Sequence, residues 1–216
     1  MIVVVKHETA FERELWGEAI RNSPSSLVPA RKIMTGDLVQ LEPLDPGIHG
    51  AALYQASHGS EQALEIWTYL PWGPWPSESE FLKHLAGNAA RFDYIWYVFR
   101  LKGGGGIKGM ACYLDIQPTQ GVIEIGGIWF APAMQRTRAA TEAPFLRLDY
   151  AMSNLRCRRR RWRCNALNRD TAWYSLLDSD WPDVRKAIAA WLDDGNFDGG
   201  GMARSSLRER MGKRAA

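Results

Sequence analysis

The chain has 216 residues, of which 46% are hydrophobic and 24% are charged, and its formal net charge at pH 7 is +3. This balance predicts one globular domain with a sizeable core and excludes a chain that is disordered over most of its length. The absence of any run of about 18 apolar residues argues against a transmembrane helix, and the apolar N-terminal run is too short for a signal peptide. We therefore expect a cytoplasmic protein without a membrane partner.

The N-terminal part of the sequence divides at about residue 36. Residues 1–35 begin with an apolar run and then become polar, and we interpret them as an N-terminal extension. A compact domain is expected over residues 36–198. Its first alternating apolar pattern predicts a strand over 37–44, and a short helix is expected over 48–57.

An aromatic loop at 67–75 precedes the clearest helix start in the sequence. Ser77 and Glu80 have the spacing of a capping box, in which each residue satisfies an amide at the start of a helix. The remaining pattern predicts, in chain order, strands over 94–101, 107–116 and 122–130, a helical stretch to about 153, strands over 161–167 and 171–177, and a helix over 182–194. This order indicates a mixed α/β domain.

Positive charge is concentrated in two places. Six arginines lie within residues 156–163, and five basic residues stand against Glu209 in the last 18 residues. Such clusters can bind nucleic acid. Because no nucleic-acid-binding motif accompanies them, we favour a solvated face and a disordered basic tail over 199–216, and nucleic-acid binding remains the less favoured alternative.

The cysteines and histidines indicate no metal site. The three cysteines form no C-x-x-C pair, and an odd number of cysteines without a secretion signal predicts reduced thiols. The four histidines have neither H-x-x-x-H nor H-E-x-x-H spacing. We expect no metal cofactor.

The segment from Gln135 to Ala143 is a candidate anion site. It connects the predicted strand 122–130 to a helix, and it contains small residues, Arg136 and Arg138. Free backbone N–H groups and the helix dipole at such a start attract phosphates, and the small side chains allow close approach. An ordinary helix N-terminus with polar residues in its first turn fits these residues equally well.

Four segments together resemble a known family: 67–75, 121–143, 162–168 and 169–182. They are similar to the GNAT superfamily of acetyl-CoA-dependent N-acetyltransferases, and within it to the RimJ/RimL-like branch of ribosomal-protein N-terminal acetyltransferases. The resemblance extends from about Thr35 to Leu207. It implies a single α/β domain with a mixed sheet flanked by helices and with an incomplete C-terminal half.

The family's acyl-CoA-binding signature, Q/R-x-x-G-x-G/A, corresponds to Gln135, Arg138 and Ala140, with Arg138 in place of the expected glycine. The resemblance implies that the amides of this loop hold the CoA pyrophosphate and that the end of the preceding strand binds the pantetheine arm through its main chain. The expected cofactor-binding residues are Ile128, Phe130, Gln135, Arg136, Thr137, Arg138, Ala139, Ala140 and Thr141.

The resemblance also implies roles on the acceptor side. Glu124 corresponds to a carboxylate that deprotonates the amine through water, and its alternative is a paired structural glutamate. The family asparagine at the end of the next strand corresponds to Asn168. The aromatic loop, with Trp67, Tyr69 and Trp72, is expected to line the acceptor site.

Two features depart from the family pattern. Pro144 lies within the predicted helix. If the helix begins at Thr141, the proline falls in the first turn and is harmless; if the helix begins at Arg138, a kink is expected. Asn168 is joined directly to Arg169, where the family has a helix and a strand, a block of about 25–30 residues. In the family that helix flanks CoA and carries the serine or tyrosine that protonates the leaving thiolate.

These observations predict acetyl transfer from acetyl-CoA to a primary amine, either a protein N-terminus or a small amine. The missing block predicts weak or absent activity. A non-catalytic CoA-binding homologue and a nucleic-acid-associated module are the two alternatives. A monomer and a homodimer both fit the sequence.

Overall fold

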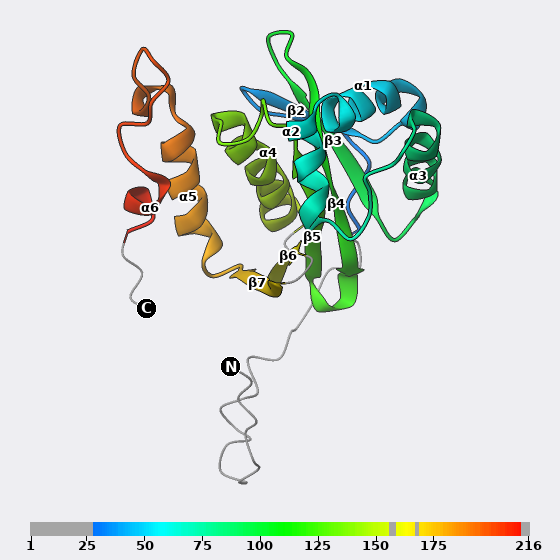
Figure 1. Cartoon of the computed structure of the whole chain (residues 1–216). Coiled ribbons are helices and arrows are strands. Elements are labelled where there is room, and N and C mark those ends of the chain that lie inside the picture. Colours follow the sequence, from blue (N-terminus) through cyan, green and yellow to red (C-terminus); the bar gives the residue numbers. More distant parts are fainter. Residues whose placement is uncertain (1–27, 156–158, 167–168, 213–216) are drawn as a thin grey trace.

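The computed structural model describes residues 28–155, 159–166 and 169–212. In this part of the chain seven strands form one sheet, in which they follow one another in sequence order (Figure 1). They are β1 (Met34–Thr35), β2 (Val39–Pro43), β3 (Ile95–Leu101), β4 (Gly106–Gln117), β5 (Val122–Phe130), β6 (Arg159–Ala166) and β7 (Arg169–Leu177). Neighbouring strands are antiparallel except β5 and β6, which are parallel. The predicted mixed α/β class is confirmed.

Helices cover both faces of this sheet (Figure 1). The helical elements are α1 (Pro46–His58), α2 (Glu61–Leu64), η1 (Glu65–Tyr69), α3 (Glu78–Ala90), η2 (Pro118–Gln120), α4 (Arg138–Asp149), η3 (Tyr150–Asn154), α5 (Trp181–Leu192), η4 (Asp194–Asn196) and α6 (Leu207–Arg210). One core lies between the sheet and α4 with α5, and the other between the sheet and α1 with α3. None of the described helices is long and apolar enough to cross a membrane.

The residues that alternate along the strands divide between the two cores. On β3, Tyr97 and Phe99 belong to the α4 core, whereas Trp96 and Val98 belong to the α1 and α3 core. Successive side chains of a strand point to opposite faces, so a strand covered on both faces is apolar at every position. This explains why the predicted strand 94–101 is almost continuously hydrophobic.

Side-chain caps fix where the helices begin. The carboxylate of Asp45 accepts the N–H groups of Gly47 and Ile48 at the start of α1, and the Ser77 hydroxyl accepts the N–H of Glu80 at the start of α3. These caps satisfy amides that have no intrahelical acceptor. The helix predicted from the Ser77 pattern is therefore present at the expected place.

α4 begins at Arg138, so Pro144 lies in its interior rather than in its first turn. Proline has no amide hydrogen, and one helical hydrogen bond is lost at this position. The helix nevertheless continues to Asp149 and then widens into the π-helical turn η3.

No helix stands between β6 and β7. Ala166 of β6 pairs with Arg169 of β7, so the two strands form an antiparallel hairpin. β6 also pairs with β5, which makes β6 an interior strand and β7 the outer one. Within the described residues, Arg159, Arg160 and Arg161 pair with β5 on one side and with β7 on the other, so this part of the arginine-rich stretch does not lie at the sheet edge.

Both predicted domain boundaries fall within folded structure. Met34 is buried, and β1 pairs with β2, so the sheet begins inside the predicted extension. At the other end, part of the segment expected to be a disordered tail is folded, because buried Asn196 hydrogen-bonds to Ser205 through both its amide nitrogen and its amide oxygen. The short helix α6 follows and packs on α5.

Candidate functional site

β5 and β6 pair along only part of their lengths. Their register runs from Val122 opposite Arg159 to Ile125 opposite Trp162, whereas β5 continues to Phe130. Among the described residues, the β6-facing edge of β5 after Ile125 has no strand partner. Backbone groups on such an edge need other donors and acceptors, so this stretch can bind an extended ligand through its main chain.

A bulge in β5 lies at the start of this free edge. The register between β4 and β5 shifts between Met110 and Cys112, and β5 has one extra residue opposite them. Gly127 in the bulge has a φ of +58°, and a Cβ atom there would lie 2.6 Å from the ring of Trp96. Only glycine fits both the conformation and the space. The bulge therefore brings the β5 backbone against the Trp96 ring.

The free edge leads directly into a tight loop. The carbonyl of Ala131 accepts the N–H groups of Met134 and Gln135, which closes the loop. The Gln135 side chain donates to the carbonyl of Phe130 at 3.0 Å. Arg136 has a φ of +60°, a left-handed conformation that turns the chain toward α4. Gln135 thus stabilises the loop, and its side chain is engaged with the main chain.

The first turn of α4 presents amides at the end of this loop. Thr137 caps the helix, and its hydroxyl accepts the N–H of Ala140 at 3.3 Å. The amides of Arg138 and Ala139 lie in the first turn, where an α-helix provides no acceptor for them. Together with the positive end of the helix dipole they can hold an anionic group.

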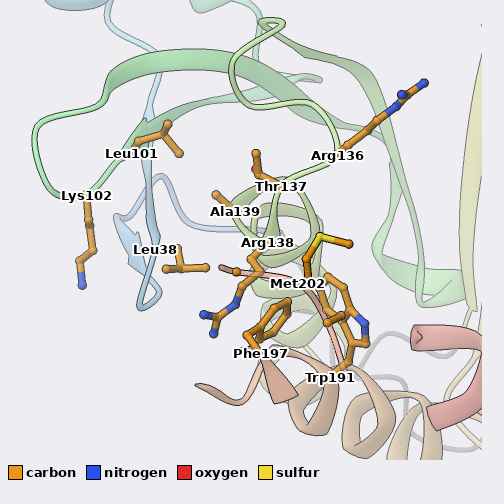
Figure 2. A pocket seen from close by; sticks show the side chains of 12 residues that line it. Leu38, Leu101, Lys102, Arg136, Thr137, Arg138, Ala139, Trp191, Phe197 and Met202 are labelled. Atoms are coloured by element: carbon orange, nitrogen blue, oxygen red, sulfur yellow. The ribbon is translucent and has the colours of Figure 1, made fainter. Parts of the chain in front are cut away.

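A cavity of ≈ 600 Å³ adjoins this turn (Figure 2). Cavities of this size are common for small-molecule ligands. Its lining residues are Leu38, Leu101, Lys102, Arg136, Thr137, Arg138, Ala139, Trp191, Phe197, Gly201, Met202 and Ala203.

Comparison with solved structures identifies the family. A GCN5-related N-acetyltransferase from Brucella melitensis is 34% identical, covers 85% of this chain and 95% of its own, and superposes with a TM-score of 0.81. The chain belongs to the GCN5-related N-acetyltransferase (GNAT) family. A probable GNAT-family acetyltransferase from Chromobacterium violaceum is also 34% identical, with 71% of this chain and 90% of its own covered and a TM-score of 0.65.

More distant GNAT structures share the fold. RimL, a ribosomal L7/L12 alpha-N-protein acetyltransferase solved in complex with coenzyme A, is 22% identical over 63% of this chain and 77% of its own, with a TM-score of 0.51. No protein-family model and no curated protein matches the chain. The predicted resemblance to GNAT enzymes is confirmed, and the chain is an acyl-CoA N-acetyltransferase by family.

The residue that departs from the GNAT signature, Arg138, does not point toward the first-turn amides. Its Nη2 donates to the carbonyl of Leu192 and to Oδ1 of Asp194 at 2.8 Å, and its guanidinium lies 4.0 Å from the centroid of the Phe197 ring. The Arg138 side chain is therefore engaged with residues 191–203, which we call the C-terminal segment.

The other predicted cofactor residues come from one continuous stretch of strand, loop and helix. Arg136 is exposed, and Figure 2 shows its side chain extending away from the rest of the cavity. Ile128 and Phe130 are partly buried against the α4 core, which leaves their main chain on the free edge of β5. Ala140 and Thr141 continue α4 and are partly buried.

Glu124 lies near the point where β5 and β6 separate. Its neighbours Ile123 and Ile125 belong to the α4 core, so Glu124 faces the opposite side of the sheet, where α1 and the aromatic loop lie. The residue is 4% exposed. This position is compatible with both the catalytic and the structural role, and the catalytic role stays a prediction.

The aromatic loop divides into core and surface residues. Trp67 is buried, donates its indole N–H to the Ser57 carbonyl at 3.1 Å, and packs against Trp75 and Trp129. The structure thus places Trp67 in the core, and contact with an acceptor is left to the half-buried Trp72. The Tyr69 side chain lies outside the described part of the chain.

Asn168 also lies outside the described residues. The resemblance to the family predicts a helix after this asparagine, but here β6 ends at Ala166 and β7 begins at Arg169. No group of three or more potential metal ligands occurs in the described ranges. Three C-terminal residues that line the cavity, Trp191, Phe197 and Met202, were not predicted as site residues. Trp191 and Phe197 lie within the predicted domain but carry no motif, and Met202 lies in the segment that was expected to be a disordered tail.

Proposed function

We propose that this chain transfers the acetyl group of acetyl-CoA to a primary amine, and that it does so slowly. One observation carries the proposal: the unpaired edge of β5 after Ile125 runs without interruption into the first-turn amides of Arg138 and Ala139. A main-chain edge followed by an anion site suits an extended arm that ends in a pyrophosphate.

Successive residues of this region would bind successive parts of acetyl-CoA. The main chain of Gly126 to Phe130 would bind the pantetheine arm, and the amides at the start of α4, with exposed Arg136 nearby, would bind the pyrophosphate. When bound, acetyl-CoA supplies an acetyl group activated as a thioester. N–H groups on the free edge would stabilise negative charge that develops on the acetyl oxygen.

Glu124 is the proposed proton acceptor. It would take a proton from the acceptor ammonium through water, which leaves the nitrogen lone pair free to attack. Its position on the face toward the aromatic loop separates it from the α4 side, so the amine would approach from the loop. The RimL structure supports a protein N-terminus as one acceptor class, and a small amine is the other.

The direct junction of β6 and β7 supports slow turnover. The resemblance to the family implies a helix here that supplies a proton to the leaving thiolate, but Ala166 of β6 pairs directly with Arg169 of β7. Without that helix, this side of the bound thioester would be open to solvent. Accurate positioning of reacting groups accounts for much of enzymatic rate acceleration, so the absence of this helix should lower the rate of acetyl transfer. The same observation favours a non-catalytic CoA-binding homologue as the second candidate.

Release of CoA thiol from acetyl-CoA, measured with a panel of small amines and N-terminal peptides, tests the proposal. We expect release that depends on the amine, at a rate below the common enzyme range of about 1–1000 per second. No release with any amine, while acetyl-CoA still binds, would establish the non-catalytic alternative. A rate within the common range would show that the short junction is a working variant.

A further inference from the structure

The carboxylate of Glu142 joins α4 to the turn between β1 and β2. Its Oε1 accepts the N–H of Asp37 at 2.8 Å, and its Oε2 accepts the N–H groups of Leu38 and Val39 at the same distance. Glu142 is buried. Hydrogen bonds from main-chain amides to a carboxylate are among the stronger ones in proteins. Glu142 therefore connects two elements that lie far apart in the sequence.

The turn between β1 and β2 leaves room for this carboxylate. The N–H of Gly36 donates to the Val39 carbonyl at 2.9 Å, which closes the turn. A Cβ atom at Gly36 would lie 2.5 Å from Oε2 of Glu142, so a larger residue there would displace the carboxylate. The ammonium of Lys102 donates to the Gly36 carbonyl at 2.6 Å. The turn is thus held both by α4 and by the residue that follows β3.

Glu142 lies one helical turn after the amides proposed to bind the pyrophosphate. Residues three and four positions apart are neighbours on a helix, so Glu142 follows Ala139 and Arg138 along α4. Leu38, whose amide donates to the carboxylate, lines the same cavity as Ala139 (Figure 2). The connection between α4 and the β1–β2 turn is therefore next to the proposed anion site.

Apolar packing alone would fix α4 less closely. Ala139 and Ala143 belong to the α4 core, but contacts between apolar side chains are non-directional. Hydrogen bonds weaken when their distance or angle changes, so the three bonds of Glu142 restrict where α4 can lie. A carboxylate near an anion site would by itself repel the anion. Position, rather than charge, is thus the property of Glu142 that can favour ligand binding.

We propose that Glu142 is a positioning residue of the donor site. It fixes the first turn of α4 against the β1–β2 turn and thereby sets the place of the amides of Arg138 and Ala139. The proposal rests on the proposed function, because these are the amides proposed to bind the pyrophosphate of CoA. Glu142 acts through these amides and does not itself contact the ligand.

Isothermal titration with CoA tests this role in variants on both sides of the contact. Glu142→Ala removes the carboxylate, and Gly36→Ala places a methyl group where the carboxylate lies. Each should weaken CoA binding about tenfold, because the first-turn amides lose their fixed position. Glu142→Gln keeps the shape and one acceptor oxygen, so it should recover part of the lost affinity.

Two matched controls separate positioning from general stability. Glu42 is a carboxylate on the face of the sheet opposite α4, where it binds Arg100 and His49. Glu42→Gln should lower the urea midpoint and leave CoA affinity unchanged. Gly87→Ala adds a methyl group to α3 with no atom within 4 Å, and it should also leave CoA affinity unchanged. Titrations are made under conditions in which urea denaturation shows every variant to be folded.

Thiol-release kinetics give a second readout of the same role. Glu142→Ala should raise the KM for acetyl-CoA about tenfold and leave kcat unchanged, because Glu142 binds no reacting group. When chemistry is slow, KM equals the dissociation constant of the substrate, so the two measurements should agree. A lower kcat with an unchanged KM would overturn the positioning role.

The remaining outcomes separate this inference from the proposed function. Unchanged CoA affinity in Glu142→Ala and Gly36→Ala, while the wild type binds CoA, would overturn the positioning role and leave the donor site intact. An equal loss of affinity in Glu42→Gln would assign the effect to general stability and would also overturn it. No binding of CoA by the wild-type chain would overturn the proposed function and this inference together.

Discussion

The two sides of the candidate site differ in how the chain builds them. The donor side consists of β5, the loop and the start of α4, which are consecutive in sequence, and the hydrogen bonds of Ala131 and Thr137 fix it locally. The side at which the leaving thiolate would be protonated depends on elements that follow β6. There the chain passes directly from Ala166 of β6 to Arg169 of β7. A binding site that one continuous segment forms can survive the loss of a neighbouring block, whereas proton transfer needs groups from several elements.

The largest predicted effect separates catalysis from donor binding. Glu124→Gln should reduce the acetyl-transfer rate by about 10²–10⁴-fold, because the amide cannot accept the amine proton. Acetyl-CoA affinity should stay unchanged, since the donor side does not include this carboxylate. Thiol-release kinetics and titration of the same preparation measure both quantities, and an unchanged rate would assign Glu124 a structural role.

A smaller effect should come from filling the β5 bulge. Gly127→Ala should reduce the free energy of unfolding by about 1–3 kcal/mol more than Gly103→Ala does, because the new methyl group meets the Trp96 ring. Gly103 is the matched control: its φ is +70°, and no atom lies within 4 Å of a Cβ placed there. Urea denaturation measures both. Equal losses would mean that Trp96 moves aside without cost.

Release of the C-terminal segment should cost less. Arg138→Ala should lower the unfolding free energy by about 1 kcal/mol, since it removes the bond to the Leu192 carbonyl and the contact with Phe197. Asp194→Asn removes only a strongly exposed partner and should cost less than about 0.5 kcal/mol. Hydrogen exchange over 193–203 should accelerate in Arg138→Ala and not in Asp194→Asn; unchanged exchange would contradict the assigned contact.

The smallest predicted effect is the decrease in the stability of the folded state at acidic pH that His58 and His84 cause. Burial lowers the pKa of His58 and of His84 from their ordinary value of 6.5, so the folded protein favours their neutral forms. The unfolded chain then binds more protons in the interval below pH 6.5, and stability falls as the pH decreases through it. Urea midpoints between pH 7.5 and about 5 should decrease in the wild type, with a shallower decrease in His84→Gln. Identical slopes would exclude His84 as a contributor.

Local signals in the sequence predicted much of the fold. The capping pattern at Ser77 and the hydrophobic runs of β3 and β5 each depend on neighbouring residues, and the structure contains these elements within a few residues of the expected bounds. The loop between Phe130 and Arg138 was expected for the same reason.

Features that depend on distant contacts were not predictable. Asn196 is an ordinary polar residue in the sequence, and its burial against Ser205 appears only when the segment after α5 turns back. Trp67 was expected at the acceptor site because the resemblance to the family implies that the aromatic loop lines that site. Its packing against Trp129, from a strand far along the chain, places it in the core. The Arg138 contact with Leu192 spans 54 positions.

Hydrogen exchange with and without acetyl-CoA tests the central claim most directly, because it reports on both sides of the site in one measurement. We predict that acetyl-CoA slows exchange of the amides in residues 126–139 and leaves the β6–β7 hairpin unchanged. Protection confined to β6 and β7, or no protection at residues 126–139 under saturating acetyl-CoA, would contradict the assignment of the donor site to β5 and α4.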